Sequence, residues 1–217
     1  APRWYGDENI DGKRILISPE QGIGDQIQFA RYALILKEKG ASVILAVMPQ
    51  LVDILQSMHQ DIIVTSALQP ANKLPAHDYY VPIMSLPGIF QANIKNIPFN
   101  KRYISPNESI AAKWRARFAN TSKMQVGVTW SGSRSHQNDI NRSMSLAQLA
   151  PLLNLDVDLH VLQTESRPED DELLKQCEIK DWRKELINMH ETAGLLDQLD
   201  LLITVDTSVA HLSAALG

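Results

Sequence analysis

The chain has 217 residues, of which 44% are hydrophobic and 21% charged, and its formal net charge is −4. This composition suits a globular protein with a buried core, and the slight negative charge excludes a general attraction to nucleic acid or anionic membranes. The single cysteine, Cys177, excludes an intramolecular disulfide and a multi-cysteine zinc site. No apolar run approaches the roughly 20 residues of a membrane span and no signal peptide is recognisable, so we expect a cytoplasmic protein.

Short apolar runs alternate with helical patterns in the first half of the chain. Strands are predicted at residues 14–18, 42–47, 61–65 and 79–82. Helices are predicted from about Asp25 to Lys39, with Gly40 as the C-terminal cap, and from Pro49 to about Met58. This alternation indicates βαβ units and a parallel sheet.

A second α/β series follows a helix at about 109–118 and a polar linker at 119–123. Strands are predicted at 125–129, 159–162 and 201–205, and helices after the capping box Ser145–Gln148, near 168–177 and near 191–199. We therefore expect an α/β protein of two lobes with parallel sheets, residues 1–120 and 121–217. The chain lacks an initiator Met and stops at Gly217, just after a predicted strand and the first turns of a helix. We expect an excerpt of a longer polypeptide, with the second lobe incomplete.

A glycine loop, Glu20–Gln26, joins the first predicted strand to the first helix. Such loops lie at the carboxyl ends of parallel strands, where open sheets bind ligands. Gly24 would let the backbone approach a ligand closely, beside a helix N-terminus that favours negative charge. A dinucleotide fingerprint would need a third glycine, where the chain has Ile27, so that interpretation is weak.

Asp25, within this loop, has two interpretations. It could be a helix N-cap, with Gln28 completing a capping box. It could instead be a general base, because the helix dipole keeps a carboxylate ionised and able to accept a proton from a hydroxyl group. Spacing alone favours the cap, which is the commoner role.

The octet Thr204–His211 runs from a strand end straight into a helix. The hydroxyls of Thr207 and Ser208, with the free N–H groups of the first helical turn, would make an anion site. Helical side chains lean toward the N-terminus, so His211 could reach the same anion. A diphosphate here would account for the polar residues; the alternative is a capped core helix with a buried histidine.

A polar loop, residues 130–143, follows the strand at 125–129. It is rich in hydrogen-bond donors, namely Arg134, Asn138, Asn141, Arg142 and Ser143. Arginine forks match phosphate oxygens, so the loop suits an anionic ligand at a strand's carboxyl end. The alternative is a solvated surface loop.

Other site classes lack their sequence patterns. The six histidines show no H-E-x-x-H spacing, and neither G-x-S-x-G nor a Walker P-loop is present. The acidic run Glu169–Glu172 is interpreted as a solvated first helical turn. We expect neither a metal ion nor a cofactor.

The motifs together resemble those of the heptosyltransferase-like glycosyltransferases of family 9, especially the branch found behind tetratricopeptide repeats in bacterial proteins. The stretches that carry the resemblance are EQGIGDQIQFARY at 20–32, SLPGIF at 85–90, GVTWSGSRSHQNDINRS at 127–143 and DLLITVDTSVAHLSAALG at 200–217. The resemblance implies a GT-B architecture of two Rossmann-like lobes, with the acceptor mainly on the first and the nucleotide-sugar donor mainly on the second. It also implies an inverting reaction that needs no metal.

The resemblance also assigns roles to residues. Asp25 matches the acidic residue thought to be the general base, and Arg142 stands where heptosyltransferases carry a lysine that neutralises the diphosphate. Ser208 replaces the glycine of the usual Asp-Thr-Gly-x-x-His signature, which leaves the donor's identity open. The residues expected to bind the donor or its phosphates are Gly24, Ser131, Arg134, Arg142, Ser143, Gln163, Asp206, Thr207, Ser208 and His211.

The expected partners are a nucleotide-diphosphate sugar, which is a substrate and not a cofactor, and a glycan, lipid-linked or protein acceptor. A tetratricopeptide repeat domain could precede the chain in the full-length protein. Two other functions remain open: a non-catalytic nucleotide- or glycan-binding module attached to such a repeat domain, and a sugar-nucleotide epimerase.

Overall fold

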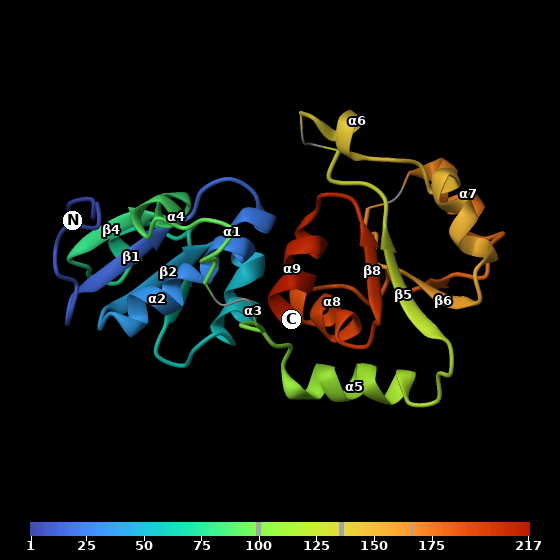
Figure 1. Ribbon diagram of the computed structural model, residues 1–217, viewed down its shortest axis with the longest axis horizontal. Coiled ribbons are helices and arrows are strands. Elements are labelled where there is room, and N and C mark those ends of the chain that lie inside the picture. Colours follow the sequence, from blue (N-terminus) through green and yellow to red (C-terminus); the bar gives the residue numbers. More distant parts are fainter. Residues whose placement is uncertain (99–100, 135–136, 166) are drawn as a thin grey trace. The chain divides into compact units, whose positions relative to one another are not determined.

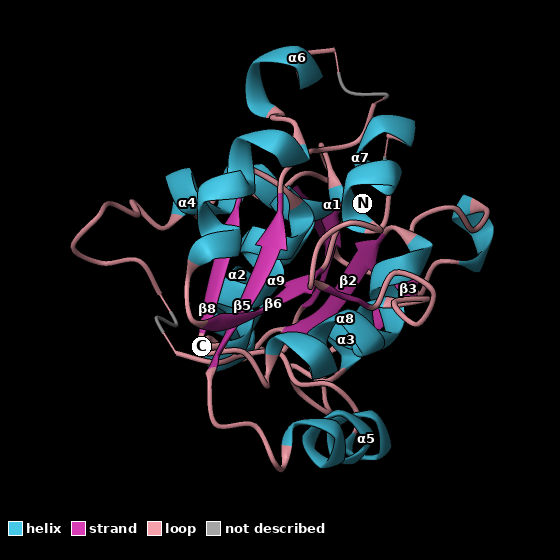
Figure 2. Ribbon diagram, turned by 90° about the vertical axis from the view of Figure 1, so that its right-hand side faces the viewer, coloured by secondary structure: helices cyan, strands magenta, loops and turns pink. Residues whose placement is uncertain are grey.

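A computed structural model describes residues 1–98, 101–134, 137–165 and 167–217. The chain forms two compact units (Figure 1), one of residues Ala1–Ser105 with Ala214–Gly217 and one of Pro106–Ser213. Each unit contains a four-stranded parallel sheet flanked by helices (Figure 2), so the predicted α/β class is confirmed. The functional boundary at residue 120 stays a prediction.

The first unit has the strand order β3-β2-β1-β4. Its strands are β1 (Arg14–Ser18), β2 (Ser42–Val47), β3 (Ile63–Ser66) and β4 (Tyr79–Pro82). Its helices are α1 (Ile23–Ala30), α2 (Tyr32–Glu38), α3 (Val52–Gln56) and α4 (Leu86–Ile89), with 3₁₀ turns η1 (Pro49–Leu51), η2 (Ala71–Lys73) and η3 (Ile83–Ser85). Burial follows the apolar runs: all of β2 except Ser42 is buried, as expected for a central parallel strand.

The helix predicted to run unbroken to Lys39 is instead two helices that meet at Arg31. The Tyr103 hydroxyl donates a hydrogen bond of 3.0 Å to the carbonyl of Ile27, which a regular helix would pair with the N–H of Arg31. Beyond the break, the N–H of Leu34 bonds to the Arg31 carbonyl in a tighter i to i+3 pattern. A side chain inserted into the helical ladder is a known cause of a break, and no local sequence signal reveals it.

The second unit repeats the topology, with the order β7-β6-β5-β8. Its strands are β5 (Met124–Thr129), β6 (Val157–Val161), β7 (Lys180–Asp181) and β8 (Leu201–Thr204). Its helices are α5 (Glu108–Phe118), α6 (Asp139–Arg142), α7 (Pro168–Leu174), α8 (Met189–Leu196) and the first part of α9 (Ser208–Leu216), with the 3₁₀ helix η4 (Leu146–Asn154); the last residues of α9, from Ala214, belong to the first unit. η4 contains Pro151, whose missing N–H is incompatible with a regular α-helix interior. β7 was not predicted, because two residues carry no strand pattern.

In both units the fourth strand pairs with the first, on the side away from the second. β4 pairs with β1, and β8 pairs with β5 in a register that sets Thr204 beside Thr129. In each sheet the second strand lies on one side of the first strand and the fourth strand on the other, so the strand order reverses there, and open α/β sheets bind ligands at such reversals. The glycine loop follows β1, and the polar loop and the octet follow β5 and β8, so all three lie at such points.

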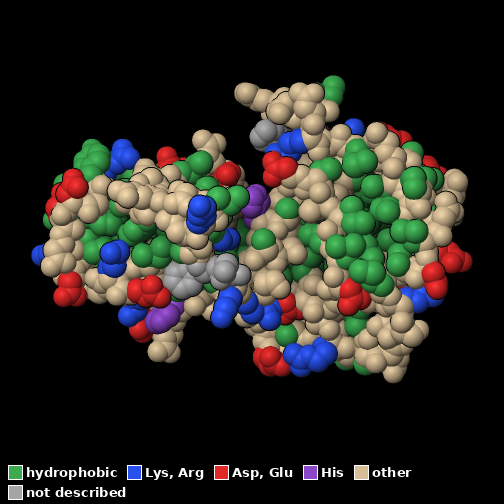
Figure 3. Space-filling view, viewed as in Figure 1, with side chains coloured by type: hydrophobic (Ala, Val, Ile, Leu, Met, Phe, Trp, Pro, Cys, Tyr) green, Lys and Arg blue, Asp and Glu red, His purple; other side chains and the backbone are tan. Residues whose placement is uncertain are grey.

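On the face shown in Figure 3, basic and acidic side chains are interspersed. This distribution is consistent with the small formal charge of −4. None of the helices in the described ranges combines the length and apolar character that crossing a membrane requires.

A buried histidine forms part of an aromatic cluster in the second unit. The His160 ring is fully buried and stacks on Phe118, with 5.0 Å between ring centroids, and on Trp182. The Trp182 indole, which can only donate, bonds to His160 Nδ1 at 2.9 Å, so the imidazole proton must be on Nε2, 2.8 Å from the Gln125 amide oxygen. Burial, and secondarily the charge of Lys180, lower the pKa of His160 to about 4.

The depressed pKa predicts acid destabilisation of this unit. The unfolded chain takes up a proton at His160 near pH 6.5 and the folded chain only near pH 4, so this contribution to stability is complete above pH 6.5 and is lost as the pH falls toward 4. In that window the free energy of unfolding should change by up to about 1.4 kcal/mol per pH unit. Urea unfolding followed by tryptophan fluorescence at pH 7 and pH 5 measures it.

The variant His160→Gln should flatten this pH dependence, although it lowers stability at pH 7. His77→Gln, a change at a half-buried histidine of the first unit, is the control and should keep the wild-type slope. An unchanged slope in His160→Gln would contradict the assignment.

Candidate functional site

The octet lies where β8 passes into α9. The N–H of Val205 extends the β5–β8 pairing by bonding to the carbonyl of Thr129 at 3.2 Å. The Thr204 hydroxyl bonds to the Thr129 hydroxyl and lies 3.3 Å from that of Thr207. This threonine contact lies just before α9, which begins at Ser208, so the predicted passage from a strand end straight into a helix is confirmed.

His211, on the first turn of α9, leans back toward the helix N-terminus. Its Nε2 lies 3.7 Å from a carboxylate oxygen of Asp206, the residue two positions before the helix. The His211 side chain is 27% exposed and that of Asp206 is 76% exposed. The predicted direction of the imidazole is therefore confirmed, and the alternative of a fully buried core histidine is wrong.

The polar loop after β5 is closed at its base. The N–H of Met144 bonds to the carbonyl of Trp130 at 2.8 Å, which brings the two ends of the loop together. The N–H of Gly132 donates to the Ser143 hydroxyl at 3.0 Å, and Ser131 is buried. These contacts order the base of the loop, whereas most of its described residues further out are exposed, so both interpretations of the loop stay open. Arg134 is exposed, and Ser135 and His136 are outside the described residues.

Arg142, in α6, lies against the backbone of Gly132. A Cβ at Gly132 would come within 2.5 Å of its Nη2 and 2.7 Å of its Nε, so only glycine admits this placement. The Arg142 Nε is buried and has no hydrogen-bond partner among the described residues. Since an unpaired charged donor is costly to bury, the arrangement favours an anionic ligand beside it.

Gln163 follows β6, and its side-chain amide forms hydrogen bonds with backbone groups of three other residues. Its amide oxygen accepts hydrogen bonds from the N–H groups of Trp130 at 3.2 Å and Ser131 at 3.0 Å. Its amide nitrogen donates to the carbonyl of Glu165 at 2.7 Å. Gln163 thus orients the polar loop; its expected approach to the nucleotide stays a prediction.

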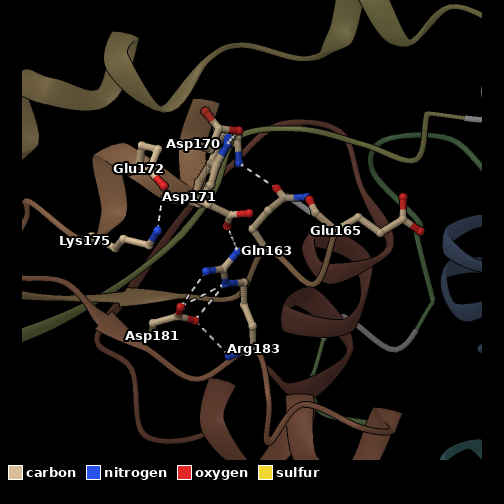
Figure 4. Close-up of polar contacts among 9 residues, drawn as sticks. Gln163, Glu165, Asp170, Asp171, Glu172, Lys175, Asp181 and Arg183 are labelled. Carbon is tan, nitrogen blue, oxygen red and sulfur yellow. Dashed lines mark hydrogen bonds and ion pairs between the residues drawn. The ribbon is translucent and has the colours of Figure 1, made fainter. Parts of the chain in front are cut away.

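The acidic run at the start of α7 differs from its predicted solvated state. Asp170 is buried, and its carboxylate accepts hydrogen bonds from the Trp130 indole at 2.9 Å and from the N–H of Leu146 at 3.1 Å. Arg183 lies between Asp171 and Asp181 and bonds to both (Figure 4). Sequence reasoning missed Asp170 because its partners are 40 and 24 residues away.

In the first unit, Asp25 is the third residue of α1 and not its N-cap. The helix begins after Gly22, whose N–H donates to Asp25 Oδ2 at 2.9 Å, so the capping box predicted with Gln28 is wrong. Gly24 is the second residue of α1, and the left-handed residue of the loop is Gln21, with φ of 56°. The preceding Glu20 accepts the N–H of Met84 at 3.0 Å, which joins the loops after β1 and β4.

The structure thus places Gly24 and Asp25 in the first unit and the other predicted site residues in the second. Within the second unit, the carboxyl ends of β5, β6 and β8 carry Ser131, Gln163 and the octet along one edge of the sheet. A hollow of about 720 Å³ lies at the opposite end of β5, lined by residues such as Lys123, Asp197 and Asp200, and none of the predicted site residues lines it. Within the described ranges no group of three or more His, Cys, Asp or Glu side chains is placed to hold a metal ion.

Solved structures of glycosyltransferases share this fold. A family 9 glycosyl transferase from Veillonella parvula matches 97% of the chain and 80% of its own, with 11% identity and a TM-score of 0.69. The dodecameric iron-containing glycosyltransferase TibC from enterotoxigenic E. coli matches 95% of the chain, with 13% identity and a TM-score of 0.64, and the chain spans 57% of its length. The E. coli ADP-heptose lps heptosyltransferase II matches 94% and 82% of the two chains, with 11% identity and a TM-score of 0.53.

No protein-family model matches the sequence, and a comparison with curated proteins finds no match. At 11–13% identity the structural likeness establishes the fold. The chain has the GT-B fold of these glycosyltransferases, with two Rossmann-like units built on parallel sheets.

Proposed function

We propose that the protein is a glycosyltransferase that moves a sugar from a nucleotide-diphosphate donor to an acceptor hydroxyl, with inversion and without a metal ion. The observation that carries the proposal is the group of anion-binding features after β5 and β8, namely Arg142 over Gly132 and the start of α9 with His211. Among the structures with this fold, TibC is solved with ADP-D-beta-D-heptose and the E. coli heptosyltransferase WaaC with ADP-2-deoxy-2-fluoro heptose.

In the proposed donor site the diphosphate is held by three kinds of group. The free N–H groups at the start of α9 and the hydroxyls of Thr207 and Ser208 donate to phosphate oxygens. His211 and Arg142 supply positive charge or further donors. These groups act most strongly on the departing diphosphate, where negative charge develops as the bond to the sugar breaks.

On the acceptor side, Asp25 is the proposed general base. Its Oδ2 accepts the Gly22 N–H, and its Oδ1 has no hydrogen-bond partner among the described residues, so it remains available to an acceptor hydroxyl. The acceptor oxygen forms a bond to the anomeric carbon, its proton passes to Asp25, and the bond from that carbon to the diphosphate oxygen breaks. The acceptor class, glycan, lipid-linked sugar or protein, stays open, as does an attached tetratricopeptide repeat domain.

A second candidate is a non-catalytic nucleotide-binding module of the same fold. It is favoured by the same bond between Asp25 and Gly22, which is sufficient to explain the residue as a structural group at the start of α1. The two candidates differ in whether the bound donor turns over.

Asp25→Asn tests the catalytic role. The amide cannot accept the acceptor's proton, so turnover of a nucleotide-sugar should fall by at least about 100-fold while the Kd for the nucleotide changes little. Rates of diphosphate release and calorimetric Kd values measure the two effects. Asp53→Asn, at the first turn of α3 in the same unit, is the matched control. Full activity of Asp25→Asn would remove the base and favour the binding module.

His211→Ala tests the donor site. Loss of the imidazole beside the start of α9 should weaken binding of the nucleoside diphosphate about tenfold, the cost of one charge-assisted hydrogen bond. Calorimetric titration with ADP, UDP and GDP, without metal and then with magnesium, measures it. Unchanged affinity in His211→Ala would exclude the imidazole from the site, and affinity that appears only with magnesium would contradict metal independence.

Gly132→Ala tests the placement of Arg142. The added methyl group would overlap the guanidinium and displace it, so we expect about tenfold weaker nucleotide binding. Gly88→Ala is the control, since a methyl group added at Gly88 would have no atom within 4 Å beyond its own helix backbone and chain neighbours. Equal nucleotide affinities in the two variants would show that Arg142 does not contact the anion from this position.

A further inference from the structure

The buried carboxylate of Asp170 joins three segments of the second unit. It lies in the first turn of α7 and is 2% exposed. One oxygen accepts the indole N–H of Trp130, the residue directly after β5, and the other accepts the backbone N–H of Leu146, the first residue of η4. Asp170 therefore contacts the first residue of the polar loop of residues 130–143 and a residue shortly after its end.

The other contacts at the base of the loop reinforce this arrangement. Gln163 accepts the backbone N–H groups of Trp130 and Ser131, so both the backbone and the side chain of Trp130 are held. α7 is itself held to the edge of the sheet, because Arg183 bonds to Asp171 in α7 at 2.6 Å and to Asp181 in β7 at 2.7 Å (Figure 4). The charge-assisted bonds of Arg183 also lower the pKa of the Asp181 carboxyl. The loop base is thus connected to the sheet through α7.

We propose that Asp170 is a positioning residue that holds the two ends of the polar loop and so sets where Ser131 and Arg142 stand at the sheet edge. The part that concerns an anionic ligand rests on the proposed donor site. Asp170 itself would not touch the ligand, since both of its carboxylate oxygens are bonded to the protein. It acts through the loop, whose Arg142 has a buried Nε without a partner among the described residues.

The chemistry of the carboxylate makes the role testable. Both partners of Asp170 are donors, and they bond to different oxygens of the carboxylate, so both positions must be acceptors. In Asp170→Asn the amide nitrogen would face one of these N–H groups, and a buried donor would be left without an acceptor. Loss of one charge-assisted bond is expected to reduce the population of chains whose loop ends are held in this position about tenfold. The apparent nucleotide affinity should fall by the same factor, because only that population binds.

Glu191 offers a matched control in the same unit. It is 9% exposed and accepts the indole N–H of Trp114 at 2.7 Å, the same pairing of buried carboxylate and indole, but it joins α8 to α5 and does not contact the polar loop. Glu191→Gln should therefore lower the melting temperature of the unit, as Asp170→Asn does. If a loss of stability by itself weakened nucleotide binding, both Asp170→Asn and Glu191→Gln would bind the nucleotide more weakly.

The experiment compares wild type, Asp170→Asn and Glu191→Gln by hydrogen exchange of residues 130–146, by thermal unfolding and by titration with ADP. We expect exchange in this segment to accelerate and ADP affinity to fall about tenfold in Asp170→Asn only. Trp130→Phe added to Asp170→Asn removes one of the two donors, so the amide oxygen can accept the remaining N–H of Leu146, and the double variant should regain protection and affinity relative to Asp170→Asn. If Asp170→Asn does not fold, Trp130→Phe alone, which removes one of the two bonds, should show the same changes to a smaller degree.

Unchanged exchange in Asp170→Asn, or equal loss of ADP affinity in Asp170→Asn and Glu191→Gln, would overturn the proposal. Failure of the donor site has a different signature, namely no binding of ADP, UDP or GDP by the wild type. In that case the exchange data alone decide: selective acceleration in Asp170→Asn retains Asp170 as the residue that orders the loop, and no acceleration overturns it.

Discussion

The parallel pairing of β5 with β8 is the constraint on which the second unit's candidate site depends. Because the fourth strand lies beside the first, Thr129 and Thr204 are partners, and the chain segments that follow them leave the sheet at adjacent points. The octet and the polar loop are 60 residues or more apart in sequence, and this pairing places the strand ends from which they start side by side. The first unit uses the same strand order, which places the glycine loop after β1 beside the connection that follows β4.

Buried polar side chains then hold these connections in place. In the first unit, Gln26 is 1% exposed and its amide oxygen accepts the N–H of Met48, just after β2. In the second unit, Gln163 and Asp170 accept N–H groups around the end of β5. In each case a side chain satisfies a backbone or indole donor that would otherwise be buried unpaired, so the same contact avoids a desolvation penalty and fixes a loop.

In the second unit, the aromatic cluster around His160 and the candidate site residues are separate groups of side chains. The cluster of His160, Trp182 and Phe118 joins α5 to β6 and to the segment after β7, and its ring nitrogens all have partners, the second one of His160 being the Gln125 amide oxygen. The candidate site residues of this unit follow the carboxyl ends of the strands and include the buried Nε of Arg142, which has no hydrogen-bond partner among the described residues. Burying a polar group without a hydrogen-bond partner costs free energy, which a bound ligand can recover by supplying the partner. The aromatic cluster has no such unpaired group among its ring nitrogens.

The sequence by itself determined the α/β class, most strands and the positions of the glycine loop, the polar loop and the octet, because these depend on local periodicity and on glycine and capping residues. β1, β2 and β4 have the predicted bounds, and α9 starts at Ser208. Only the tertiary structure decided which residues are neighbours across the chain. Tyr103 breaks the helix at Arg31, Asp25 bonds to Gly22 as the third residue of α1, and Asp170 is buried against Trp130. The contacts of Tyr103 and Asp170 join residues 24 to 76 positions apart, so no local signal could have revealed them. The bond of Asp25 to Gly22 is local, but the sequence admitted more than one start for this helix, and helix ends are the least certain part of such a prediction.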